Sequence, residues 1–385
     1  MKVIFLNRSL KEYTGAGRFA LALIREFKNL ISGFECAVLT TEPSSHPLDV
    51  PIIYRNKFKL FATIPAIIKI FKTYDIVHAL DAWPYGVVAA LAVQKMRVVS
   101  RKRPKLIITA IGTGAVKPLY SWWRRPIMAW AYKKADKVVA VSNNTKREIL
   151  KFLPNLKIEV INHGVDITKF QNPNDKSQIN SKIQNLKPYI LSAGFLKERK
   201  GFEFSIRAFA EIADKYPKIT YVIFGTDNYP DNREYNRLKK IAENLGVGNR
   251  VKFLSYDNEW FGGHGRISDE DLANLYRGAE LFVLLPQDFN KDIEGFGLVF
   301  LEAAAASLPV IATRGTSAED AVRDGKNGLL VPVGEYKEAA EAIGKILSDQ
   351  NLKTSFSAES LKFAKEMSWE KAARAYQKIY ESLKV

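Results

Sequence analysis

Residues 284–313 read LLPQDFNKDIEGFGLVFLEAAAASLPVIAT and carry the most specific pattern in the chain. An apolar strand ends at Pro286, a polar loop follows, an alanine-rich helix begins after the EGFG sequence that starts at Glu294, and a second apolar strand ends at Thr313. Strand, loop, helix and strand in this order are typical of one crossover unit of a parallel sheet. Because ligands of open parallel sheets bind beyond the carboxyl ends of the strands, the loop is a candidate binding site.

Outward from this segment, strand-like apolar runs alternate with helical patterns, and the alternation restarts after a polar stretch at residues 171–185. The chain of 385 residues is long enough for two domains, each with its own core. The sequence therefore predicts an α/β fold of two Rossmann-like, doubly wound parallel-sheet domains that face each other across a cleft, with residues 1–170 in the first domain and residues 171–368 in the second. The predicted strands are residues 3–6, 36–40, 75–80, 105–112, 137–142 and 157–162, and then 189–194, 219–225, 250–255, 280–286, 308–313 and 328–333.

Helical spacing is clearest at the end of the chain, in residues 369–385. Apolar residues recur there on one face, with charged residues opposite, which predicts an amphipathic helix that packs on one of the domains. Residues 17–30 and 122–134 are further helix candidates.

Glu294 and Glu302 are eight positions apart, so one carboxylate lies in the loop before the predicted helix and the other lies two turns along it. Carboxylates accept hydrogen bonds from neighbouring hydroxyl groups, and free N–H groups after Gly295 suit an anion. Such a loop suits a sugar, its diphosphate and a ribose in a row. The alternative is an acid that complements the helix dipole and a second that faces solvent, which explains Glu294 but not Glu302 in its apolar surround.

Two glycine-containing loops also follow predicted strands and lead into helices. In TGAGR, Gly15 and Gly17 let backbone N–H groups approach a phosphate. In GFLKERKG, Gly194 turns the chain, and Arg199 and Lys200 stand where a helix begins, although solvent-facing cations are the alternative. A dinucleotide site is not favoured, because the first loop has the G-x-G-x-x-A variant and no acidic residue clearly ends the second strand.

The net charge of +17 is unevenly distributed along the chain. Residues 50–135 contain sixteen lysines and arginines but only two acids, Asp75 and Asp81. A locally basic surface attracts nucleic acid, anionic lipid headgroups or phosphorylated small molecules, and the alternative is a solvated surface that aids solubility.

Two stretches of this basic span, residues 57–72 and 119–134, combine basic and large apolar side chains as an interfacial helix does. In the second stretch, Trp122, Trp123 and Trp130 suit a lipid headgroup region. The alternative for the first stretch is that Pro65 interrupts it and that its apolar residues pack on the sheet.

The compartment is inferred from three features of the sequence. Cys36 is the only cysteine, so neither an internal disulfide nor a cysteine-based metal site is expected. The start MKVIFLNRSL lacks the core of a signal peptide, and no apolar run reaches the roughly 20 residues of a membrane-spanning helix. We therefore expect a cytoplasmic protein, and the basic span of residues 50–135 predicts that it attaches peripherally to the inner face of the membrane.

The E-x7-E element EGFGLVFLE, followed by AAAASLPVIATRGTSAEDAVRDGKNGLLV, resembles family 4 of the retaining GT-B glycosyltransferases, the glycosyl transferases of group 1. The resemblance extends over nearly the whole chain, through TGAGR, DIVHAL, VVAVSNNTKREI, VINHGVD, GFLKERKG and SWEKAARAYQKIY. It implies a GT-B fold in which the terminal helix, residues 369–385, crosses back onto the first domain. It also implies a metal-independent, retaining hexosyltransferase without a cofactor, which moves a hexose from a nucleoside diphosphate sugar to a glycan or polyprenyl- or lipid-linked acceptor at the cytoplasmic membrane face.

The resemblance further implies roles for individual residues. Glu294 contacts hydroxyl groups of the donor sugar, Glu302 holds the ribose, and Lys200 binds the diphosphate. The remaining donor-binding positions are glycines and backbone groups that cradle the sugar and diphosphate or close over them, namely Gly15, Gly17, Gly194, Gly295, Phe296, Gly297 and Leu298.

This sequence departs from the family pattern at three places. Phe195 stands where a phosphate-binding arginine is usual, and Arg199 is the candidate substitute. Gly112 and Thr113 occupy the place of a histidine often found near the sugar, and the domain-junction turn contains His163.

In a retaining reaction of this kind, the leaving diphosphate takes the acceptor proton on the same face of the sugar, while Lys200 and helix N–H groups stabilise its charge. No metal is expected, because His78, His163 and His264 are scattered single residues that suit structural roles. The alternatives are a nucleic-acid-binding protein and a non-catalytic protein on the same fold. The basic stretch lacks a nucleic-acid-recognition pattern, and the presence of both Glu294 and Glu302 argues against a non-catalytic role.

Overall fold

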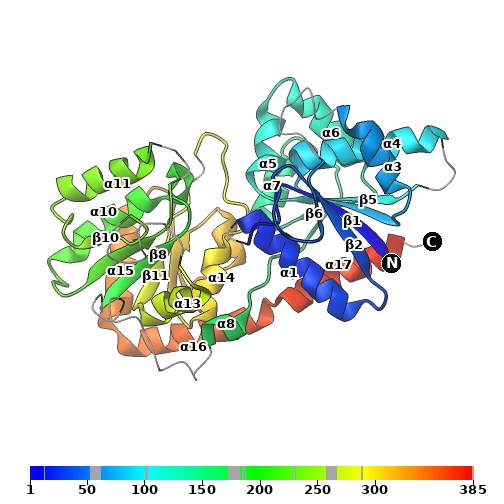
Figure 1. The fold of residues 1–385 in the computed structure, drawn as a ribbon. Helices are drawn as coiled ribbons and strands as arrows, with labels where there is room; N and C mark the ends of the chain where they lie inside the picture. Colours follow the sequence, from blue (N-terminus) through cyan, green and yellow to red (C-terminus); the bar gives the residue numbers. More distant parts are fainter. Residues whose placement is uncertain are drawn as a thin grey trace. The chain divides into compact units, whose positions relative to one another are not determined.

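The computed structural model describes residues 1–12, 14–52, 62–99, 103–171, 183, 186, 188–227, 229, 231–256, 267–287 and 289–383. The chain divides into two compact units, and each unit contains a parallel sheet (Figure 1). Unit 1 comprises Met1–Gly164, Lys291–Phe296 and the segment from Trp369 onward, and unit 2 comprises Val165–Asn290 and Gly297–Ser368. The predicted α/β class with two parallel-sheet domains is confirmed.

The sheet of unit 1 has the order β3-β2-β1-β4-β5-β6-β7 within the described residues, and each pair is parallel. Because helices cover both faces, the central strands are almost entirely buried, and most of their residues are apolar. After β1 the chain continues to β2 on one side, and after β4 it continues to β5 on the other side. The neighbours β1 and β4 therefore form the topological switch point of the sheet. The strands are β1 (Lys2–Asn7), β2 (Glu35–Thr40), β3 (Asp49–Val50), β4 (Ile76–Leu80), β5 (Lys105–Ala110), β6 (Lys137–Ala140) and β7 (Ile158–Val160).

The helices of unit 1 form two layers around its sheet (Figure 1). On one face, α1 (Gly15–Leu30) packs along α17 (Trp369–Leu383), and on the other, α4 (Val87–Val99) packs against α3 (Ile64–Phe71) and α6 (Arg124–Lys134). Shorter helical segments follow the strands; they are η1 (Ala82–Gly86), α5 (Thr113–Val116), η2 (Lys117–Tyr120) and α7 (Asn143–Leu150).

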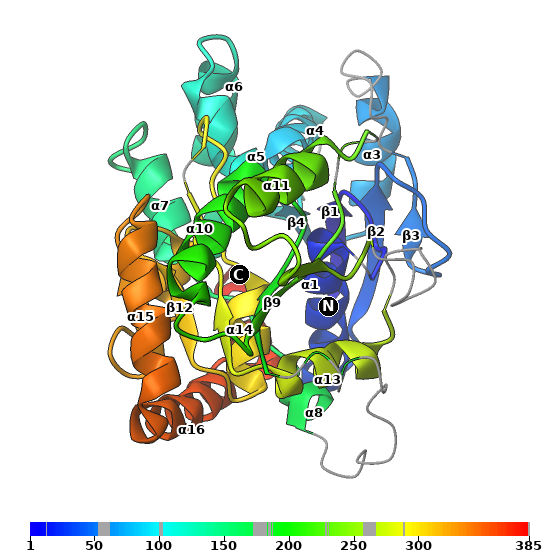
Figure 2. The ribbon, with the colours of Figure 1, turned by 90° about the vertical axis from the view of Figure 1, so that its left-hand side faces the viewer.

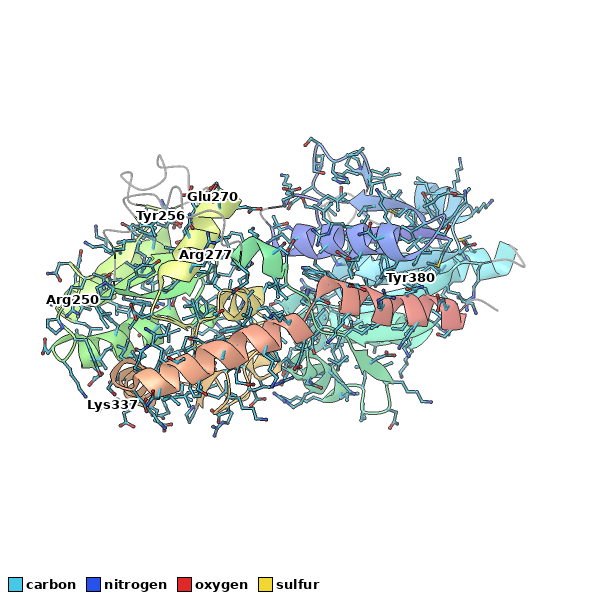
Figure 3. All side chains as sticks on the ribbon, turned by 90° about the horizontal axis from the view of Figure 1, so that it is seen from below. Arg250, Tyr256, Glu270, Arg277, Lys337 and Tyr380 are labelled. Atoms are coloured by element: carbon cyan, nitrogen blue, oxygen red, sulfur yellow. The ribbon has the colours of Figure 1, made fainter. Side chains whose placement is uncertain are left out.

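Helix α17 is attached to the sheet by buried hydrogen bonds as well as by apolar contacts. The hydroxyl of Tyr380, labelled in Figure 3, lies 2.7 Å from Nδ1 of His78, and Nε2 of His78 lies 2.7 Å from Oγ1 of Thr109. The hydroxyl of Tyr376 lies 3.1 Å from the same threonine oxygen. The terminal helix thus belongs to unit 1 although most of the chain between Val165 and Ser368 belongs to unit 2.

The sheet of unit 2 has the order β10-β9-β8-β11-β12-β13, with its switch point between β8 and β11. Its described strands are all paired in parallel. They are β8 (Tyr189–Ala193), β9 (Thr220–Phe224), β10 (Val251–Phe253), β11 (Leu281–Val283), β12 (Val310–Thr313) and β13 (Gly328–Val331).

Helices cover both faces of this second sheet as well. In Figure 2, α10 (Phe202–Ala213) lies beside α11 (Arg233–Asn244) and α15 (Tyr336–Ser348). A second group packs together and consists of α8 (Ile167–Gln171), α13 (Asp269–Gly278), α14 (Leu298–Ala305) and α16 (Gln350–Glu366), and short turns form η3 (Glu198–Lys200) and η4 (Ser317–Asp320). Arg250, labelled in Figure 3, donates to the carbonyl oxygens of Ala213 (2.7 Å) and Ile219 (3.1 Å), which ties the turn after α10 to the start of β10.

The elements differ from the sequence-based expectation in several places. Helix α14 begins only at Leu298, so Glu302 lies one turn along it and not two, and α6 begins at Arg124. Strand β3 was not predicted, because two residues are too short for an alternating pattern. The first candidate membrane stretch contains α3, where Ile64, Ile67 and Phe71 are buried in the core of unit 1 and Pro65 stands in the first turn of the helix. Residues 57–61 of that stretch, and most of the polar stretch 171–185, lie outside the described residues.

Candidate active site

The switch point of unit 2 brings together the loops that follow β8 and β11. Gly201 adopts a φ of 70°, and a Cβ atom there would lie 1.6 Å from the carbonyl oxygen of Leu285, so only glycine allows this approach. The backbone N–H of Gln287 donates to the carbonyl oxygen of Arg199 at 2.8 Å. The two loops are therefore held together at the edge where parallel sheets bind ligands.

Lys200 lies within this loop pair and is buried, with 7% of its surface exposed. A Cβ atom at Gly194 would lie 3.6 Å from its Nζ atom, so the ammonium group stands directly beside the turn that ends β8. The ammonium group carries a positive charge at the edge of the sheet where parallel sheets bind ligands, which makes this a suitable position for a phosphate. Arg199 is partly exposed next to it, and Phe195 is 38% exposed on the same loop.

Helix α14 of unit 2 carries two further residues of the predicted site, Leu298 and Glu302. Gly297 precedes its first residue, Leu298, so free backbone N–H groups point outward at this helix start. Glu302 lies one turn further on, is 7% exposed, and accepts a hydrogen bond of 2.9 Å from the hydroxyl of Tyr276. The alternative of a solvent-facing Glu302 is therefore wrong.

The segment Lys291–Phe296, which carries Glu294, belongs to unit 1. Ile293 is part of that unit's hydrophobic core, and its carbonyl oxygen accepts a hydrogen bond of 3.1 Å from Thr113 Oγ1, which also donates to the carboxylate of Asp292. Ser142 Oγ donates to the carbonyl oxygen of Gly295 at 2.7 Å. These contacts fix the backbone on both sides of Glu294, whose own side chain is buried at 7% exposure.

The Glu294 segment also makes a backbone-to-backbone contact that explains one departure from the family pattern. A Cβ atom at Gly112 would lie 2.7 Å from Cα of Gly295, so the two glycines pack directly on each other. A histidine in place of Gly112 would displace this segment. Phe296, the last residue of the segment, contacts the ring of His163 at a centroid distance of 5.2 Å.

The first glycine loop lies at the start of α1, also in unit 1. The N–H of Gly17 donates to Thr14 Oγ1 at 3.0 Å, and a Cβ atom at Gly17 would lie 2.1 Å from the carbonyl oxygen of Lys11. The N–H of Gly17 is thus engaged in capping the helix, whereas a Cβ atom at Gly15 would meet no described atom within 4 Å. Of the two glycines, Gly15 has the more open surroundings for a ligand.

The described histidines of the sequence prediction are buried. Burial lowers the pKa of His78 and of His163 to about 3, so both rings are neutral at physiological pH. His264 lies outside the described residues. Among the described residues, no group of three or more His, Cys, Asp and Glu side chains is arranged to hold a metal ion.

Asp81 is a polar residue that the sequence interpretation did not assign to the site. It directly follows β4, at the switch point of unit 1, and adopts a φ of 151°, which is unusual for a residue other than glycine. The signal that could have found it is its place immediately after the predicted strand at residues 75–80, where the same rule that selected Gly15 and Gly194 applies.

Comparison with solved structures agrees with this architecture. Anabaena HepE, solved in complex with UDP and glucose, superposes with a TM-score of 0.80 over 99% of this chain and 100% of that chain, at 20% sequence identity. Two doubly wound units with this topology define the fold as GT-B.

Family models account for both halves of the chain. Residues 13–169 match Glycosyltransferase Family 4, and residues 173–363 match Glycosyl transferases group 1. The chain belongs to the GT-B glycosyltransferases of the family 4 type.

Two curated relatives indicate the range of the family. A D-inositol 3-phosphate glycosyltransferase of Corynebacterium jeikeium is 33% identical over 232 residues, which is 59% of this chain and 52% of the relative. A GDP-mannose-dependent α-(1-6)-phosphatidylinositol monomannoside mannosyltransferase of Mycolicibacterium smegmatis is 28% identical over 237 residues, which is 59% of this chain and 58% of the relative. The chain thus spans little more than half the length of these relatives.

Proposed function

We propose that the protein is a hexosyltransferase that moves a hexose from a nucleoside diphosphate sugar to an acceptor hydroxyl group. The observation that carries the proposal is the arrangement in unit 2, where a buried lysine and a buried glutamate stand on the segments that follow the adjacent strands β8 and β11. A diphosphate requires the cation, and a ribose diol requires the carboxylate. The UDP and glucose named for the HepE structure are ligands of this kind.

In this proposal, each predicted residue has a defined task in donor binding. Glu294 accepts hydrogen bonds from the sugar hydroxyls, and Glu302, already oriented by Tyr276, accepts them from the ribose. Lys200 and Arg199 bind the diphosphate together with the N–H groups at the start of α14. Gly194 and Gly15 leave room for the backbone to approach the phosphates.

We further propose that the sugar keeps its anomeric configuration and that no divalent cation takes part. The bond from the anomeric carbon to the diphosphate oxygen breaks, the acceptor oxygen attaches to the same face, and the acceptor proton passes to the departing diphosphate. Lys200 and the α14 N-terminus stabilise the charge that develops on that group.

A donor panel tests the proposal. We expect UDP or GDP to bind the wild type in calorimetry, and the corresponding hexose donor to be hydrolysed in the presence of EDTA with retention at the anomeric carbon. Glu294→Ala should lower turnover about 100-fold while nucleoside diphosphate binding persists, because Glu294 contacts the sugar and not the nucleotide. Glu338→Ala, an exposed position on α15, is the control. Absence of nucleoside diphosphate binding at millimolar concentration, or an inverted product, would contradict the proposal.

For the acceptor, we propose a glycan or lipid-linked molecule reached at the cytoplasmic face of an anionic membrane. The names of the two relatives contain inositol phosphate and phosphatidylinositol, both anionic acceptors. In this chain, the acid-poor span contains Trp122, which is 86% exposed, and Trp123, which is 38% exposed. Arg124 stacks on Trp123 with its guanidinium carbon 4.6 Å from the ring centroid.

The second candidate stretch therefore divides into an exposed tip and a helix with one buried face. Trp122, Trp123 and Arg124 form the tip, whereas Met128 and Tyr132 are buried in unit 1 and Trp130 packs against that core. Exposed tryptophan beside arginine suits a headgroup region. In the part of the chain that the structure describes, no helix is both long and apolar enough to cross a bilayer.

A further inference from the structure

Asp81 is a residue of unit 1 to which the proposed donor site gives no role, and its carboxyl group is held in a defined position. Its Oδ1 atom accepts a hydrogen bond of 2.7 Å from the N–H of Ala82, and the N–H of Ile111 also donates to the carboxyl group. A Cβ atom at Gly114 would lie 2.0 Å from Oδ2, so the glycine leaves the space that the carboxyl group fills. The start of η1 and the segment after β5 together hold this group in place.

The segment that follows β5 contacts Asp81 on one side and the Glu294 segment on the other. Ile111 and Gly114 contact the Asp81 carboxyl group, while Gly112 and Thr113 contact Gly295 and Ile293. All of these residues belong to unit 1. Asp81 is therefore a near neighbour of the backbone that presents Glu294 to the donor sugar.

The backbone of Asp81 is strained at this point. A φ of 151° with a ψ of 156° lies in a region that glycine almost alone adopts, and the surrounding structure must impose it. Strain of this kind concentrates at functional sites, and the residue remains partly exposed at the carboxyl end of its strand. Among the described residues, no lysine or arginine forms an ion pair with Asp81.

We propose that the Asp81 carboxylate binds the attacking hydroxyl group of the acceptor and orients it toward the anomeric carbon of the donor sugar. The inference rests on the proposed function and adds the residue that positions the nucleophile. The hydroxyl proton still passes to the departing diphosphate, so the carboxylate directs the lone pair of the oxygen without being consumed. When no acceptor is present, water occupies the same place and is the nucleophile in donor hydrolysis.

Burial raises the pKa of Asp81 to about 8, so its ionised form increases across the neutral range. Among the described residues, the titratable groups that interact with it are Tyr85 of η1 and Tyr132 of α6. Burial raises the pKa of Tyr85 to about 12 and raises that of Tyr132 well above its usual value. Both tyrosines stay neutral between pH 6 and 9. A titration in that range is therefore expected to report Asp81.

The rate of donor hydrolysis tests the inference. The donor is whichever of UDP-glucose and GDP-mannose the wild type hydrolyses faster. Asp81→Asn keeps the shape and tolerates the backbone conformation but cannot ionise, and Asp81→Gly removes the group without backbone strain. Both variants should lower kcat at least tenfold at unchanged donor KM, and the rise of wild-type kcat between pH 6.5 and 8.5 should be absent in Asp81→Asn. Asp75→Asn, at the opposite end of β4, is the control.

The outcomes separate this inference from the proposed function. Unchanged kcat in Asp81→Gly, with binding of the selected donor's nucleoside diphosphate intact, would overturn the role of Asp81 and leave the proposed function standing. A parallel loss of binding of that nucleoside diphosphate would also overturn it, because a residue that orients the nucleophile does not contact the nucleotide. A wild type that hydrolyses neither donor and binds neither UDP nor GDP would overturn the proposed function and this inference together.

Discussion

At the scale of single residues, Asp81 makes the stability of the protein depend on pH. An unfolded aspartate ionises near pH 4, whereas the folded protein holds the pKa of Asp81 at about 8. The folded state therefore binds a proton that the unfolded state has released over this whole range. The bound proton makes its full contribution to the free energy of unfolding below pH 4. Between pH 4 and pH 8 this contribution is lost, at up to about 1.4 kcal/mol per pH unit.

We expect Asp81→Asn to be more stable than the wild type at pH 8 and similar to it at pH 4, since asparagine does not titrate. Urea unfolding at pH 4, 6 and 8 would measure the difference. A variant that is less stable than the wild type at every pH would show that the ionised carboxylate has a stabilising partner in the fold.

The burial of Glu302 was predictable, because its charge conflicts with its apolar surroundings. Glu302 was selected as an acid in an alanine-rich helix, and it is buried with Tyr276 as a hydrogen-bond donor. The contact between Gly112 and Gly295 could not be predicted, because it joins residues from distant parts of the chain by backbone approach alone. The roles of Glu294, Lys200 and Arg199 in the reaction remain predictions.

At the scale of elements, α17 shows a polar contribution that a hydrophobic pattern does not reveal. The spacing of apolar residues predicted an amphipathic helix, and Trp369, Tyr376 and Tyr380 are buried as expected. The pattern did not show that two tyrosine hydroxyls reach His78 and Thr109 inside the sheet. His78 stays neutral because burial lowers its pKa to about 3, so each of its ring nitrogens needs one hydrogen-bond partner.

Tyr380→Phe should destabilise unit 1 by about 1–3 kcal/mol, because it leaves one buried nitrogen of His78 without its partner. Tyr336→Phe, in the first turn of α15, removes a hydroxyl from a partly exposed side chain and is the control. Calorimetric melting of both variants would measure the effect. Equal melting temperatures for Tyr380→Phe and the wild type would contradict the importance of this hydrogen bond.

Burial separates the two membrane-candidate stretches at the same scale. Both contain basic and apolar residues, but the described part of the first stretch buries its large apolar side chains in the core, whereas the second presents Trp122 and Trp123 at the surface. Sequence periodicity could not distinguish them, since an amphipathic helix has the same pattern whether its apolar face meets a core or a lipid headgroup. The tip formed by Trp122, Trp123 and Arg124 is therefore the part to test.

At the scale of the whole molecule, the local excess of positive charge predicts a preference for anionic membranes. We expect the wild type to co-sediment with phosphatidylglycerol vesicles at low salt and to remain in solution with phosphatidylcholine vesicles, because each basic residue near an anionic surface contributes about 1 kcal/mol. Trp122→Ala should weaken this partitioning about tenfold, which corresponds to about 1.4 kcal/mol.

Leu245→Ala, which removes an exposed apolar side chain of unit 2, serves as the control and should leave partitioning unchanged. Equal partitioning of the wild type onto both kinds of vesicle, or onto neither, would favour a water-soluble acceptor. Salt should reverse the attachment, since the attraction is electrostatic.

Unit 1 is assembled from three separate segments of the chain, and this limits how chimeras can be made between this protein and its relatives. A chimera that replaces residues 1–164 with those of a relative would still carry residues 291–296 and 369–383 of the original parent. The partners of Ile293 and Tyr380, namely Thr113 and His78, would then come from a different protein. An exchange of acceptor preference by a single crossover is therefore expected to yield poorly folded hybrids, whereas transplanting all three pieces together should preserve the grafted half.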